Sequence, residues 1–86
     1  MEREIFVVQG STGEYSDRIE WIVAAFASEH EAYERADNAK AEADRLFEET
    51  KDSLLARLDA KNKYDEAMEI DYTGVIYGVI KIKLYE

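Results

Sequence analysis

The sequence predicts an α+β fold: a single-layer, three-stranded antiparallel sheet in β-β-α-β order, with one long helix packed on one face. Two apolar segments rich in β-branched and aromatic residues, 4–8 and 19–26, predict the first two strands. A stretch without glycine or proline from Ser28 to Lys63 predicts the helix. The clearest period-two alternation, from Val75 to Tyr85, predicts the last strand. The 86 residues allow one small domain, 1–86.

The first two strands are expected to form a hairpin. Residues 10–17 between them are rich in turn formers, and Gly10 and Gly13 supply turn dihedrals. A phosphate-binding loop would need a GK[ST] motif leading into a helix, whereas the next segment reads as a strand. This segment therefore predicts a hairpin tip.

The helix is expected to begin at Ser28. The Ser28 hydroxyl can accept from the Glu31 N–H, and the Glu31 carboxylate can reach back to the Ser28 N–H, as in a capping box. Small apolar residues at helical spacing then allow a close approach to the sheet, namely Ala32, Ala36, Ala39, Ala43 and Leu46.

The far half of the helix does not continue this stripe. Leucines at 54, 55 and 58 replace it, and Leu55 is out of phase. A helix to Lys63 would also measure about 52 Å, whereas strands of seven or eight residues cover only about 25 Å. Either the helix breaks near Thr50 to Ser53, or Leu54, Leu55 and Leu58 meet a second surface.

The last strand offers two faces. We expect Ile76, Ile80, Ile82 and Leu84 to pack against the alanine stripe. The other face then carries Val75, Tyr77, Val79 and Tyr85, with Phe6 or Trp21 according to register. A patch this rich in apolar and aromatic residues is typical of an interface. Together with the leucines, it predicts a homodimer in which Tyr77 and Tyr85 are anchors.

Charge and composition exclude several classes of function. Twenty acidic against eleven basic residues give a net charge of −9, which argues against binding to nucleic acid or to an anionic membrane. The absence of cysteine excludes disulfides and thiolate metal sites. No apolar run is long enough to span a membrane, and the first residues are not a secretion signal, so we expect a cytoplasmic location.

Most acidic residues of the helix fall on one face. A sector of about 80° holds five carboxylates, with a sixth, Glu34, at its flank. The five are Asp37, Asp44, Glu48, Asp52 and Asp59. Two interpretations stay open: a solvated helix face, or a row of carboxylates that imitates a phosphate backbone and is diluted by Lys40, Arg45 and Lys51.

The residues for catalysis or metal binding are few. His30 is the single histidine, and it falls near the start of the helix. The acidic cluster Asp65, Glu66, Glu69 and Asp71 lacks the spacing of an EF-hand and predicts a solvated loop. We therefore expect no metal, no cofactor and no enzymatic activity.

Several segments resemble a family of small uncharacterised phage and bacterial proteins. The most specific is the GEYSDR string from Gly13 to Arg18, followed by residues 21–26, the Ser28 capping box and the segment Asp71 to Gly74 before Tyr77. The resemblance implies a small cytoplasmic protein encoded by a phage or mobile element. It implies no activity and assigns no catalytic residue.

The function that these observations favour is that of a small acidic protein-binding protein without catalytic activity. The class that fits best is an inhibitor of a host nucleic-acid-binding defence complex, as anti-CRISPR proteins are, acting on a basic surface of a host protein in the host cytoplasm. The alternative is a homo-oligomeric structural or regulatory module without inhibitory activity.

Overall fold

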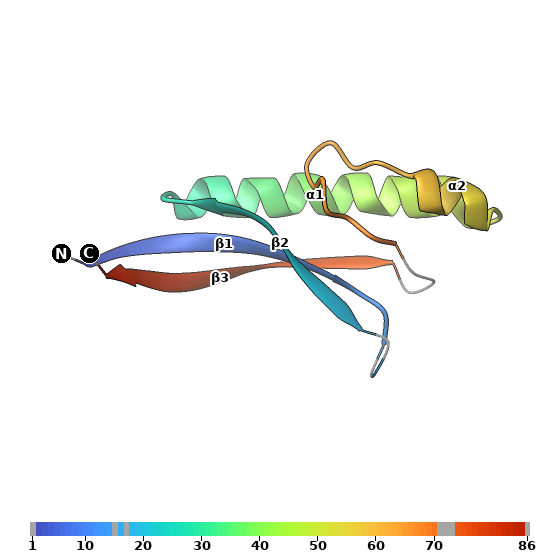
Figure 1. The fold of residues 1–86 in the computed structure, drawn as a ribbon. Helices are drawn as coiled ribbons and strands as arrows, with labels where there is room; N and C mark the ends of the chain where they lie inside the picture. Colours follow the sequence, from blue (N-terminus) through green and yellow to red (C-terminus); the bar gives the residue numbers. More distant parts are fainter. Residues whose placement is uncertain (1, 15, 17, 71–73, 86) are drawn as a thin grey trace.

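A computed structural model describes residues 2–14, 16, 18–70 and 74–85. The chain runs through β1 (Glu2–Thr12), β2 (Ile19–Phe26), α1 (Glu29–Thr50), α2 (Leu54–Asp59) and β3 (Val75–Tyr85). The three strands form one antiparallel sheet in the order β2-β1-β3, and α1 lies along one face of it (Figure 1). The predicted α+β architecture and its element order are confirmed.

The central strand is longer than the sequence predicts. Gly10, Ser11 and Thr12, expected in the hairpin tip, continue β1 and pair with residues of both neighbouring strands. The prediction failed here because their turn-forming tendency is weaker than two sets of ladder hydrogen bonds. The turn begins at Gly13, whose φ of 92° lies in the left-handed region that favours glycine.

The start and the break of the helical region are as expected. Ser28 caps α1, and its hydroxyl accepts from the Glu31 N–H at 3.3 Å. At the other end, the Thr50 hydroxyl donates to the carbonyl of Leu46 at 2.7 Å. Ser53 then caps α2 by accepting from the Ala56 N–H at 3.2 Å. The helix therefore breaks between Thr50 and Ser53.

The alanine stripe of α1 faces the sheet. Its buried residues are Ala32, Ala36, Ala39, Ala43, Leu46 and Thr50. Because α1 has 22 residues, it is about 33 Å long, close to the roughly 36 Å of the 11-residue strands β1 and β3. The mismatch of an unbroken helix with the sheet is therefore resolved by the break, one of the two predicted outcomes: once the chain breaks after Thr50, helix and sheet match in length.

The face of β3 that packs against α1 is the opposite of the predicted one. The core joins Phe6 and Val8 of β1 to the alanine stripe, and Tyr77 and Val79 of β3 pack against this cluster. Val75, on the same side of β3, is also buried. The predicted inner set points away from α1 and is largely exposed: Ile76, Ile80, Ile82 and Leu84.

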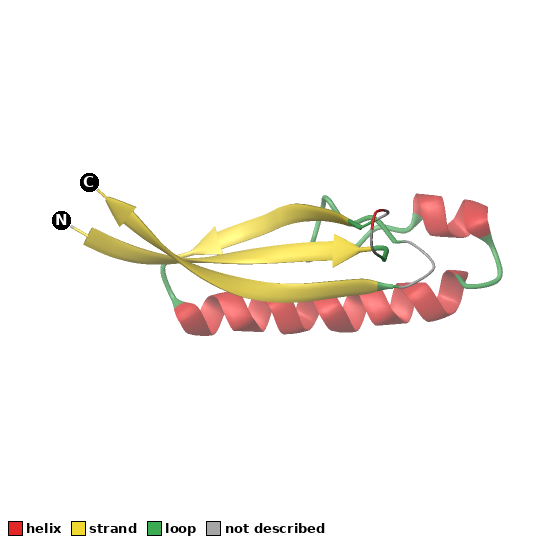
Figure 2. Cartoon of the chain, turned by 90° about the horizontal axis from the view of Figure 1, so that it is seen from below, coloured by secondary structure: helices red, strands yellow, loops and turns green. Residues whose placement is uncertain are grey.

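An offset between sheet and helix explains the reversed face. The β1–β2 ladder begins at Phe6, which also pairs with Lys81, so residues 2–5 pair only with β3. This two-stranded end runs past the start of α1 (Figures 1 and 2). Lys81 and Lys83 share the side of Val79 but fall where the helix cover ends, so they are exposed. The alternation alone cannot reveal this boundary.

Candidate functional site

The return segment, residues 60–70, carries a buried acid. Asp65 is only 2% exposed, and its Oδ2 accepts from the Trp21 indole N–H at 2.8 Å and the Tyr77 hydroxyl at 2.7 Å. Its Oδ1 accepts from the backbone N–H of Ala67 at 3.2 Å. We call Trp21, Asn62, Asp65 and Tyr77 the Asp65 cluster.

Asn62 joins this cluster to the helix. Its side-chain amide donates to the carbonyl of Ala39 at 3.0 Å, and its Oδ1 accepts from the Tyr64 N–H at 2.9 Å. The backbone N–H of Asp65 donates to the Asn62 carbonyl at 3.0 Å. The Asp65 cluster thus connects α1, the return segment and both outer strands of the sheet.

Gly10 makes room for this arrangement. It lies in the central strand between Trp21 and Tyr77, its partners on either side. A Cβ atom at Gly10 would lie 2.7 Å from Cε2 and Nε1 of the Trp21 indole. The indole can therefore lie over the strand and direct its N–H at Asp65 only because residue 10 has no side chain.

The chemistry of the cluster is that of a structural contact. Burial, and to a smaller extent the hydrogen bond to Asp65, raises the pKa of the Tyr77 hydroxyl, so this group stays a donor. Both oxygens of the Asp65 carboxylate are occupied by donors of the chain itself. These contacts hold the return segment against the sheet.

The prediction of a solvated acidic loop is wrong for Asp65 and correct for Glu66 and Glu69, which are exposed. Asp71 lies outside the described residues. Local sequence does not distinguish Asp65 from its acidic neighbours, since its two side-chain donors, Trp21 and Tyr77, come from β2 and β3. The available signal was the need of a partly buried tryptophan and tyrosine for a hydrogen-bond acceptor.

The acidic face of the helix region is divided between three elements. Asp37, Asp44 and Glu48 lie exposed on α1, about 140° around the helix from the alanine stripe. Asp52 lies in the turn after α1, and Asp59 lies in α2. The single sector drawn through all five is therefore wrong, because the helix ends at Thr50. We call Asp37, Asp44 and Glu48 the acidic row.

Local cations contact part of this surface. Lys40 pairs with Asp44 at 2.6 Å, and Lys51 pairs with Glu48 at 3.0 Å. Glu34, predicted to flank the row, lies 3.4 Å from His30. All of these side chains are about half exposed or more, so the pairs are weak and can be exchanged for a stronger partner.

The leucines of α2 make no core. Leu54, Leu55 and Leu58 are 68%, 76% and 70% exposed. Arg57 holds α2 to α1 instead: its guanidinium lies 5.3 Å from the centre of the Phe47 ring and donates to the carbonyl of Lys51 at 3.3 Å. The leucines therefore remain free for contact, as predicted, although no second surface covers them within the described chain.

A second apolar surface lies on the sheet side that faces away from α1. We call it the outer sheet face; around the buried Val7 it comprises Ile5, Ile22, Ile76, Ile80, Ile82 and Leu84. Ile76 and Ile22 are 63% and 60% exposed, and Ile80, Ile82 and Leu84 more than 40% each. Tyr77, predicted as an anchor of the uncovered face, instead packs beneath α1. Tyr85 is exposed, but on the side of Tyr77, beyond the start of the helix.

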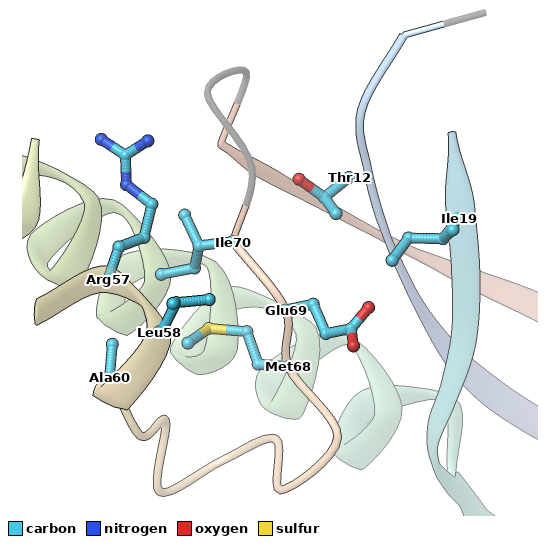
Figure 3. Close-up of a pocket in the computed structure, with 8 residues that line it drawn as sticks. All are labelled: Thr12, Ile19, Arg57, Leu58, Ala60, Met68, Glu69 and Ile70. Carbon is cyan, nitrogen blue, oxygen red and sulfur yellow. The ribbon is translucent and has the colours of Figure 1, made fainter. Parts of the chain in front are cut away.

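The pocket in Figure 3 lies between α2, the return segment and the ends of β1 and β2. It has a volume of about 380 Å³, and most of its lining is apolar. Its two charged side chains, Arg57 and Glu69, point away from each other (Figure 3). The eight residues that line it are Thr12, Ile19, Arg57, Leu58, Ala60, Met68, Glu69 and Ile70. This geometry does not bring an acid and a base together on one substrate atom.

The described residues offer neither a metal site nor a membrane-spanning helix. Across the described ranges, no three His, Asp or Glu side chains are grouped so that they could hold a metal ion. No helix in the same part of the chain is long and apolar enough to cross a membrane.

No family model matches the chain, and no significant match was found among curated proteins or solved structures.

Proposed function

We propose that this chain is a small acidic protein-binding protein without catalytic activity, and that its partner presents a basic surface to α1. The narrower form of the proposal is an inhibitor encoded by a phage or mobile element, which occupies the nucleic-acid-binding surface of a host defence complex in the cytoplasm. Anti-CRISPR proteins are the class with this mode of action.

The observation that carries the proposal is the placement of the acidic row. Asp37, Asp44 and Glu48 project from one helix, separated by seven and four residues, or about 10 and 6 Å along its axis. The stripe that packs on the sheet lies on the other side of the helix, so a partner can reach the row without disturbing the core. A net charge of −9 would speed the approach of a basic partner.

The test compares two variants with the same change in charge. The first is Asp37→Asn, Asp44→Asn, Glu48→Gln, which neutralises the row. The second is Glu14→Gln, Glu66→Gln, Glu69→Gln, which neutralises three exposed acids outside α1. The native chain and both variants are immobilised and used to capture proteins from a nuclease-treated bacterial lysate, followed by elution with heparin.

The proposal expects a captured protein that heparin elutes, that binds duplex DNA by itself, and that releases this DNA when the native chain is added. Capture should weaken at least about tenfold for the row variant and remain nearly unchanged for the control. Equal capture by both variants would mean that only total charge matters and would reject phosphate imitation.

The alternative, a homo-oligomeric module, is favoured by a different observation, the outer sheet face. In that case the row variant keeps the function of the native chain, and substitutions on the outer sheet face remove this function. The row variant therefore separates the two proposals, since it loses capture in the first and behaves like the native chain in the second.

A further inference from the structure

We infer that two copies of this chain pack face to face through the outer sheet face. The inference does not depend on the proposed function of the acidic row. It replaces the predicted dimer anchors, which are the leucines of α2, Tyr77 and Tyr85, with the aliphatic residues of β3 and Ile22.

The first support is the distribution of apolar surface. The inner side of the sheet is covered by α1, and α2 packs on α1. None of the described segments covers the outer sheet face, although four large aliphatic residues of β3 and one of β2 lie there. Exposed apolar patches of this size on small domains usually mark an interaction site.

Charge indicates that a second copy is the occupant. Among the described residues on the outer side of the sheet, charged side chains stand at the two ends, with Arg3 at one and Glu20 with its partner Arg18 at the other. A second copy also carries a charge of −9, so it can approach closely only through a neutral face. Packing through this face places the two α1 helices on opposite outer sides, about 30 Å apart, several Debye lengths at physiological salt.

The size of the face is sufficient for a dimer of moderate affinity. Strands of 11 residues give a length of about 36 Å, and three strands at about 4.8 Å spacing give a width of about 14 Å. Each copy then contributes about 500 Å², and the pair buries about 1,000 Å², the lower bound of specific interfaces. We therefore expect a dimer that dissociates on dilution.

Gly78 gives the face a notch that suits symmetric packing. It lies on the outer side of β3 between Ile76 and Ile80, and a Cβ atom there would have nothing within 4 Å. In a two-fold interface, an isoleucine of each copy can enter the notch of the other. Because each residue of a two-fold interface occurs once in each copy, a single substitution changes the interface at two places.

The experiment is analytical ultracentrifugation of the full chain from about 5 μM to about 1 mM. Three proteins are compared: the native chain, the variant Ile80→Lys, Ile82→Lys on the outer sheet face, and the variant Leu54→Lys, Leu55→Lys on α2. All four substituted side chains are at least 43% exposed, so both variants should fold, which far-ultraviolet circular dichroism checks.

The inference expects the mass of the native chain to rise from 9.9 kDa towards twice that value with concentration. The outer-face variant should weaken the dimer at least about a hundredfold, because two buried lysines are added from each copy. The α2 variant should dimerise like the native chain.

Three results would overturn the inference. The first is a native mass that stays at 9.9 kDa at the highest concentration. The second is a dimer that the α2 substitutions abolish and the outer-face substitutions spare. The third is open-ended association together with slow amide exchange along the free edge of β3, which would indicate strand-to-strand pairing instead.

Discussion

The two sides of the sheet differ in chemistry, and the more aliphatic side is the one left uncovered. The inner side holds Trp21, Tyr77 and a glycine beneath α1, and a buried carboxylate joins them. The outer side carries five exposed isoleucines and leucines: Ile22, Ile76, Ile80, Ile82 and Leu84. The comparison teaches that apolar content does not decide which side a helix covers.

Small residues and satisfied polar groups decide it here. Alanines bring α1 close to the sheet, and the aromatic residues beneath it need an acceptor for their N–H and O–H groups. Asp65 supplies that acceptor from the return segment. On the outer side, the contacts of Gln9 with Glu20 and of Arg18 with Ser11 lie towards one end, and the aliphatic residues of β3 are suited to contact with another apolar surface.

The largest expected loss of stability comes from a substitution on the inner side of the sheet. Asp65→Ala removes the acceptor of both Trp21 and Tyr77 and should lower the free energy of unfolding by about 3 to 5 kcal/mol. Urea denaturation followed by Trp21 fluorescence measures this loss. The control is Glu66→Ala, an exposed neighbour, which should stay within about 0.5 kcal/mol of the native chain. Equal effects of the two substitutions would show that the Asp65 cluster does not hold the fold.

A pair of glycine substitutions compares the two sides directly. Gly10→Ala places a Cβ atom against the Trp21 indole and should destabilise the fold by about 1 to 3 kcal/mol. Gly78→Ala adds the same atom on the outer side, where nothing lies within 4 Å, and should stabilise the strand by up to about 1 kcal/mol. Urea midpoints of both variants, measured at a concentration where the chain is monomeric, show whether each substitution raises or lowers the stability. If both variants lost stability, the sheet would not differ in packing between the side covered by α1 and the outer sheet face.

The smallest effect concerns alkaline pH. Because the folded state raises the pKa of Tyr77, its hydroxyl contributes stability that is fully present below the unfolded pKa of about 10 and is lost at higher pH. Stability should fall above pH 10 by about 1 kcal/mol per pH unit, less than the full linkage value because Tyr77 is only partly buried. Tyr77→Phe should reduce this decline when urea midpoints are compared at about pH 9 and pH 11. An identical decline in the variant would assign it to other groups.

Local signals predicted much of the fold. The capping box at Ser28, the alanine stripe and the change of pattern after Thr50 indicate the helix region. The bounds of β2 follow from its apolar composition, and those of β3 from its period-two alternation. Features that depend on contacts between segments distant in the sequence could not be predicted from these local signals. Lys81 and Lys83 occupy the core side of β3 only because the sheet runs past α1, and Asp65 is buried only because Trp21 and Tyr77 meet over Gly10.

The candidate surfaces were predicted to a similar extent. The acidic row and the leucines of α2 are exposed, because the helical spacing of the acids and the out-of-phase leucines are local features. An uncovered apolar face of the sheet was also expected. Its residues could be named only if it were known which side of β3 meets α1. A period of two leaves that choice open, so Tyr77 was placed on the wrong side.

Thiol labelling of two neighbouring positions in β3 tests the difference between the two sides most directly, since the native chain has no cysteine. Val79→Cys places the thiol beneath α1, and Ile80→Cys places it on the outer sheet face. With a chromogenic disulfide reagent, Ile80→Cys should react rapidly at low protein concentration and more slowly as the concentration rises and copies pair. Val79→Cys should react slowly at every concentration. Equal rates at the two positions, or a rate at Ile80→Cys that does not depend on protein concentration, would contradict the account.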